Sequence, residues 1–155
     1  MPLNVCISYG TADDQVTALR LQALAAVYGL TAYVPPAHTR KTRSVDAEMR
    51  SKIQGCDVFV GINVLQGFPE QDKEAFWKER EIALSSGNPM VLIGTPEGLV
   101  INNNKDVFLD PEQPDKSESR LTDFLERTPL SPDTTRAVGA LGTVALGLLM
   151  FAPQE

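Results

Sequence analysis

The segment from Val58 to Ile62 reads Val-Phe-Val-Gly-Ile, with no polar side chain at any position. A strand with one face in water alternates apolar and polar residues, whereas a strand covered on both faces is apolar throughout. The segment therefore predicts a buried strand over residues 57–64, inside a sheet that helices cover on both sides.

Similar short apolar runs recur along the chain and alternate with segments of helical periodicity. The predicted strands are at residues 3–9, 31–34, 57–64, 90–94 and, more weakly, 107–109. The predicted helices are at residues 11–28, 44–54, 71–86 and 119–128. This alternation predicts an α/β fold with a doubly wound, parallel sheet of the flavodoxin-like kind.

The ends of these elements carry clear signals. Gly29, Gly55 and Gly87 follow three of the predicted helices, as glycine caps do, and Pro35-Pro36 ends the second strand because proline cannot donate to a sheet. Five apolar residues at helical spacing are expected to turn the first helix toward the sheet: Val16, Leu19, Ala23, Leu24 and Val27.

Composition excludes several classes of function. The chain of 155 residues fits one domain, and 14 Lys and Arg against 20 Asp and Glu give a net charge of −6, which argues against nucleic-acid binding. Cys6 and Cys56 lie in or beside apolar runs, which favours reduced thiols in a cytoplasmic protein. With His38 as the only histidine and no zinc-type spacing, no metal site is expected. The N-terminus has no signal-peptide pattern.

One acidic residue stands out in the predicted helix at 71–86. Trp77, Glu81 and Leu84 fall on one helix face, so Glu81 is expected to be a partly buried carboxylate beside an aromatic ring. The alternative is a solvated Glu81 beside a half-buried Trp77. Glu79 lies on a different face and is expected at the surface.

Two further segments are candidates for binding a ligand. Arg40 and Arg43 belong to a basic loop that could hold a diphosphate, because guanidinium groups bind phosphate bidentately, although a solvated loop has the same composition. Ser8-Tyr9-Gly10 ends the first predicted strand, where ligands bind in sheets of this kind.

Taken together, these segments resemble Toll/interleukin-1 receptor (TIR) domains. Ile7-Ser8-Tyr9 resembles the opening strand of that family, and Trp77-x-x-x-Glu81-Ile82 resembles its Trp-x-x-x-Glu-Ile helix. Between them, three segments follow in the family's order and resemble its second strand, its BB loop and its third strand: residues 28–34, 35–43 and 53–60. The resemblance covers about residues 3–128.

The resemblance implies a flavodoxin-like TIR fold and, by analogy with bacterial TIR enzymes, cleavage of the nicotinamide–ribose bond of NAD. It makes Glu81 the catalytic carboxylate and places Trp77 beside the nicotinamide. Ser8, Tyr9 and Gly10 would face the substrate, and Arg40 or Arg43 would hold phosphate. NAD would be the substrate and no separate cofactor is expected. The product would be ADP-ribose, a cyclic form or an adduct, in prokaryotic antiviral defence.

Two other functions stay open. One is a non-catalytic TIR adaptor that works by homotypic docking, and the other is a nucleoside deoxyribosyltransferase-like enzyme, which shares the sheet and a catalytic acid. Self-association into a homo-oligomer is expected from the resemblance in either TIR case.

A further C-terminal region is expected after the TIR-like domain at 1–128. Residues 129–136 are expected to form a linker, and residues 137–155 an apolar helix. The 16 residues of 137–152 carry no charge, and Gly139, Thr143 and Gly147 place small residues on one face. This helix would pack on the domain, pack on a second copy, or contact a membrane as a short anchor; it could also be the stub of a longer protein.

Overall fold

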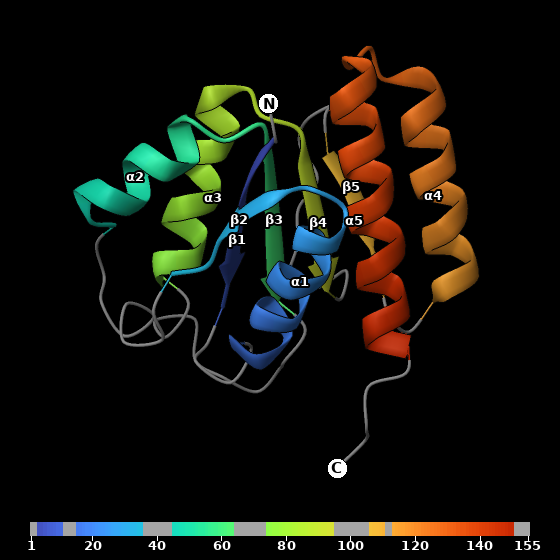
Figure 1. The fold of residues 1–155 in the computed structure, drawn as a ribbon, viewed down its shortest axis with the longest axis horizontal. Coiled ribbons are helices and arrows are strands. Elements are labelled where there is room, and N and C mark those ends of the chain that lie inside the picture. Colours follow the sequence, from blue (N-terminus) through green and yellow to red (C-terminus); the bar gives the residue numbers. More distant parts are fainter. Residues whose placement is uncertain are drawn as a thin grey trace.

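The computed structural model describes residues 3–10, 15–35, 45–63, 74–94, 106–110 and 113–150. Five strands form one parallel sheet in the order β2-β1-β3-β4-β5 (Figure 1). The strands are β1 (Asn4–Tyr9), β2 (Thr31–Tyr33), β3 (Val58–Asn63), β4 (Met90–Gly94) and β5 (Asp106–Leu109). The prediction of a doubly wound α/β fold is confirmed, including the weak fifth strand.

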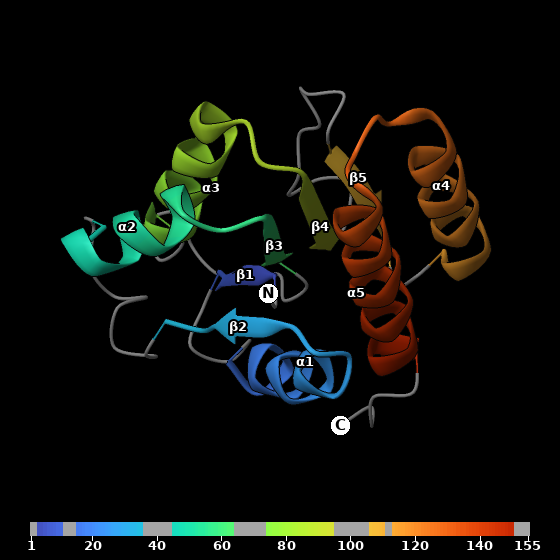
Figure 2. The same cartoon turned by 45° about the horizontal axis from the view of Figure 1, so that its top comes forward.

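Helices cover both faces of this sheet (Figure 2). They are α1 (Gln15–Val27), α2 (Ala47–Gln54), α3 (Glu74–Ser86), α4 (Pro114–Arg127) and α5 (Pro132–Met150). One core cluster joins α2 and α3 to the sheet, and the other joins α1, α4 and α5 to its opposite face. The central strand β3 supplies Val60 to one cluster and Phe59 to the other, so it is buried on both sides, as its sequence predicts.

Gly61 lets α3 approach the middle of the sheet closely. A Cβ atom at this position would lie 3.1 Å from Cδ2 of Leu92 and 3.2 Å from Cε2 of Phe76. The absence of a side chain at Gly61 therefore makes room for the Phe76 ring, which is fully buried between α3 and the strands.

The prediction for the buried face of α1 is wrong. The structure buries Ala18, Leu21 and Ala25, whereas Val16 is 58% exposed and Val27 is 78% exposed. The helix has apolar residues on both sides, so its periodicity does not select one face. Ala18, Leu21 and Ala25 follow at i, i+3 and i+7, and this stripe is the one that packs in the core cluster with the strands.

The second helix begins later than predicted. Asp46 is its N-cap, and the Asp46 carboxylate accepts a 2.7 Å hydrogen bond from the backbone N–H of Met49. The predicted cap Ser44 lies outside the described residues, as does the predicted helix start at Thr11. Met49 and Ile53 are buried, as expected from their spacing.

The C-terminal helix α5 is part of the domain. It begins at Pro132, inside the region predicted as a linker, and Val138 and Leu141 are buried in the same core cluster as β3 and β4. Two glycines of α5 lie against α4: a Cβ on Gly142 would come within 2.7 Å of Leu121, and one on Gly139 within 3.4 Å of Leu125. Of the alternatives for this helix, packing on the domain is the one that the structure shows, whereas residues 132–136 of the expected linker belong to α5. Gly139 and Gly142 serve this packing within the chain.

In the part of the chain that the structure describes, no helix combines the length and the hydrophobicity that crossing a bilayer requires.

Candidate active site

A buried polar pair lies at the carboxyl end of β1. The hydroxyl of Ser8 donates a 2.6 Å hydrogen bond to Oε1 of Glu79, and the two residues are 0% and 1% exposed. Side chains alternate along a strand, so Ile7 and Tyr9 point to the face that α1, α4 and α5 cover. Ser8, which lies between them in the sequence, points to the α2–α3 face and reaches α3. Glu79 lies near the start of α3, and α3 begins at the carboxyl edge of the sheet.

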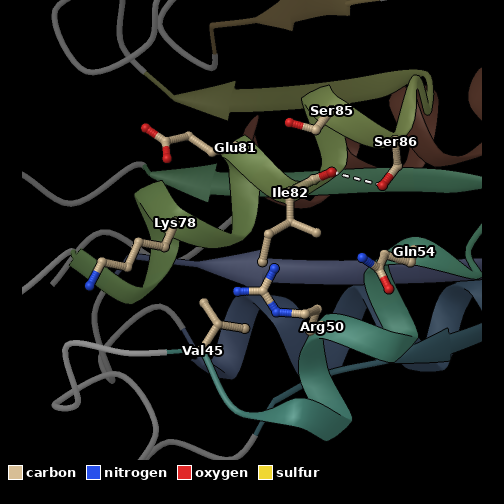
Figure 3. Close-up of a pocket in the computed structure, with 8 residues that line it drawn as sticks. All are labelled: Val45, Arg50, Gln54, Lys78, Glu81, Ile82, Ser85 and Ser86. Carbon is tan, nitrogen blue, oxygen red and sulfur yellow. Dashed lines mark hydrogen bonds between the residues drawn. The ribbon is translucent and has the colours of Figure 1, made fainter.

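The structure reverses the expected environments of the two glutamates. Glu79, expected at the surface, is buried, and Glu81, expected to be half-buried against Trp77, is exposed on the outer side of α3 (Figure 3). The reason is the stripe that α3 turns toward the sheet. Its members follow at i, i+3, i+4 and i+7: Phe76, Glu79, Arg80 and Ala83. The sequence signal for this stripe is the apolar pair Phe76 and Ala83, seven residues apart on either side of Glu79.

An aromatic and a cationic side chain flank Glu79 on the same helix. Trp77 is half-buried, and its ring meets Phe76 edge-on with centroids 5.0 Å apart. The guanidinium carbon of Arg80 lies 5.9 Å from the centroid of the Trp77 ring, and Arg80 is only 8% exposed. Arg80 therefore belongs to the buried stripe of Glu79. Trp77 lies on the neighbouring face, and its ring meets that stripe through the guanidinium of Arg80.

Tyr9 has a structural contact at the edge of the sheet. It is fully buried, and its hydroxyl donates a 2.6 Å hydrogen bond to the carbonyl of Pro35, which follows β2. The side chain therefore braces the ends of two neighbouring strands. Its expected contact with a substrate stays a prediction and, as for the equally buried Ser8, would require the site to open. Gly10 extends the sheet, since its N–H donates to the carbonyl of Ile62 at 3.0 Å.

Tyr33 is a neighbour of this region that the sequence analysis missed. It pairs in register with Cys6, so its ring lies on the same face of the sheet as Ser8. Burial raises the pKa of the Tyr33 phenol, and the negative charges of Glu48, Asp46 and Glu79 raise it further. Nζ of Lys52 lies 5.5 Å from the centroid of the Tyr33 ring. The only signal in the sequence is its place as the last aromatic residue before Pro35-Pro36.

Several expectations concern other residues. Arg40 and Arg43 lie outside the described residues. Within the described ranges, no group of three or more His, Cys, Asp or Glu side chains could hold a metal ion.

Cys6 and Cys56 are both buried and reduced. The Cys56 thiol donates to the carbonyl of Ile53 at 3.1 Å, and burial raises its pKa to about 11, so this thiol is a structural group rather than a nucleophile.

Chemically, a buried carboxyl group held by a hydroxyl at this edge of a parallel sheet can stabilise a positive charge that develops on a ligand. Ligands bind beyond the carboxyl ends of the strands in such sheets, which is where Ser8 and Glu79 lie. Comparison with models of known protein families gave no match, and comparison with curated proteins gave none either.

Proposed function

We propose that this protein is a TIR-like enzyme that cleaves the nicotinamide–ribose bond of NAD, with Glu79 as its catalytic carboxylate. The observation that carries the proposal is the buried hydrogen bond from Ser8 to Glu79 at the carboxyl end of β1. The resemblance of residues 3–128 to TIR domains suggests the reaction and the defence role. We assign the carboxylate to Glu79 instead of Glu81 because Glu79 is the buried one of the two.

The reaction needs stabilisation of charge more than proton transfer. Nicotinamide leaves the pyridinium as a neutral molecule, so no general acid is required, and the ribose becomes oxocarbenium-like in the transition state. A carboxylate at the ribose stabilises that cation, and a site without water strengthens the effect. Ser8 would hold the carboxyl group in place, and Trp77 would pack on the nicotinamide or ribose.

The burial of Glu79 adds a requirement to this proposal. A side chain that is 1% exposed contacts a substrate only after the groups above it have moved apart. Turnover would therefore include an opening step, as in enzymes whose loops and lids move during the catalytic cycle. Arg80, beside Trp77, would add a positive charge that favours the diphosphate of NAD over a neutral nucleoside.

The deciding experiment compares two glutamates two positions apart on α3. Glu79→Gln keeps an acceptor for the Ser8 hydroxyl but lacks the charge, and we expect it to lose at least about 100-fold in nicotinamide release. Glu81→Gln should lose little, because its carboxylate lies on the outer side of the helix. Glu126→Gln, on the exposed side of α4, controls for the loss of one surface charge.

Nicotinamide release is followed by chromatography, with crowding agents present to promote assembly. Circular dichroism checks that each variant is folded. Full turnover by folded Glu79→Gln would refute the assignment of Glu79. The same chromatogram identifies the product as ADP-ribose, a cyclic form or an adduct, and deoxynucleosides as a second substrate test the deoxyribosyltransferase alternative.

A second candidate function, homotypic docking without catalysis, is favoured by the outer face of α1. Large apolar side chains are exposed there and just after the helix: Val16, Leu19, Leu24, Val27 and Tyr28. Exposed apolar patches of this kind mark interaction sites. If the wild-type protein releases no nicotinamide but Val27→Asp lowers the oligomer mass in light scattering, the docking function replaces the enzymatic one.

A further inference from the structure

A groove between α2 and α3 lies apart from the Ser8–Glu79 pair, on the outer side of α3. It has a volume of about 570 Å³, within the range of small-molecule pockets. Among the described residues, its lining includes Val45, Arg50, Gln54, Glu81, Ile82 and Ser86 (Figure 3).

The centre of this groove holds polar groups that can donate hydrogen bonds. Figure 3 shows the guanidinium of Arg50 reaching from α2 toward the side chain of Ile82 on α3, with the Gln54 amide one turn further along α2. Within the described part of the chain, the side chains of Arg50 and Gln54 have no hydrogen-bond or ion-pair partner. The Ser86 hydroxyl is already used, because it donates to the carbonyl of Ile82 at 2.8 Å.

The charge and the shape of the groove favour one kind of ligand. A guanidinium has a planar fork of donors that matches the oxygens of a phosphate group, and the amide of Gln54, one turn along α2, supplies a neutral donor. Among the described residues of the lining, Glu81 carries the only carboxylate, and it is turned away from Arg50 (Figure 3). The half-buried side chains of Val45 and Ile82 give the groove an apolar wall, which suits an organic body attached to the anion.

We propose that the α2–α3 groove binds a phosphomonoester of a small organic molecule, with Arg50 as the main contact to the phosphate. The Gln54 amide adds a neutral donor, and Val45 and Ile82 pack against the organic part. This binding does not depend on NAD cleavage, so it stands or fails separately from the proposed function.

The test uses ribose 5-phosphate, inorganic phosphate and ribose as probes in isothermal titration calorimetry. The wild-type protein should bind ribose 5-phosphate saturably, inorganic phosphate more weakly and ribose not at all. Arg50→Gln should weaken the binding of ribose 5-phosphate at least about tenfold, because the bidentate contact is lost, and Arg50→Lys should restore part of it.

Arg20→Gln is the matched control, since Arg20 is an exposed arginine on α1, outside the groove. It should bind the probe as the wild type does. Arg50 is exposed, so its variants should fold, which circular dichroism checks. If the wild-type protein binds neither ribose 5-phosphate nor inorganic phosphate saturably, the proposal is overturned. Equal affinities of Arg50→Gln and the wild type for ribose 5-phosphate would also overturn it.

Discussion

The hydroxyl of Ser8 and Oε1 of Glu79 are 2.6 Å apart, although 71 positions separate the two residues in the chain. This contact joins the end of β1 to the first turns of α3 inside the α2–α3 layer. It places one carboxyl group at a defined point of the sheet edge, and both the proposed chemistry and the stability of that edge depend on it.

Removing the donor of this pair should destabilise the fold. Ser8→Ala leaves the buried Glu79 carboxyl group without the Ser8 hydroxyl, so we expect a loss of about 1–3 kcal/mol in the free energy of unfolding. Urea denaturation measures the loss. Ser119→Ala, at an exposed position of α4, is the control and should change little. Equal stability of the two variants would show that the Ser8–Glu79 bond contributes nothing.

The orientation of α1 predicts opposite results for two leucines. Leu21 is 1% exposed and packs in the core, so Leu21→Ala should cost about 2–5 kcal/mol. Leu19 is 44% exposed, and Leu19→Ala should change the stability by less than about 0.5 kcal/mol. Thermal and urea unfolding compare the two. A larger loss for Leu19→Ala than for Leu21→Ala would mean that α1 packs on the sheet through the face of Val16, Leu19 and Val27.

The contact between α5 and α4 predicts a contrast between two glycines. Gly142→Ala places a methyl group within 2.7 Å of Leu121, which should cost about 1–3 kcal/mol of overpacking against a gain of about 1 kcal/mol in helix propensity. A Cβ on Gly147 would meet no atom of the described residues within 4 Å beyond its own helix backbone and chain neighbours, so Gly147→Ala should only gain propensity. If both variants gain equally in urea unfolding, α5 does not pack against α4 in this way.

The buried thiol of Cys56 predicts a loss of stability at alkaline pH. Its pKa is raised from 9.0 to about 11 in the folded protein, so between these values the unfolded chain loses the proton first. The unfolded state then binds fewer protons than the folded state, and the free energy of unfolding falls as the pH rises from about 9 to about 11.

Urea titrations at intervals from pH 7 to pH 11 measure this slope. Cys56→Ala has no thiol to titrate, so its stability should fall less steeply than that of the wild type over the same interval. Parallel curves for the two proteins would show that the thiol is not responsible.

Much of the architecture follows from the sequence alone. Apolar runs such as the one around Val60 have no polar position that could face water, so they require a sheet covered on both sides, and the alternation with helices requires parallel strands. Local signals at Gly29 and at Pro35 also mark correctly where elements end. These features depend on neighbouring residues only, which is why they can be read without a structure.

The identity of the buried carboxyl group, by contrast, was decided by tertiary packing. Trp77 and Glu81 share a helix face, but α3 turns the stripe that begins at Phe76 toward the sheet, because Gly61 leaves room for the Phe76 ring. That rotation carries Glu79 to Ser8 and leaves Glu81 outside. A helix with large side chains on more than one face has no local preference for its orientation, so only the shape of the surface beneath it selects which glutamate is buried.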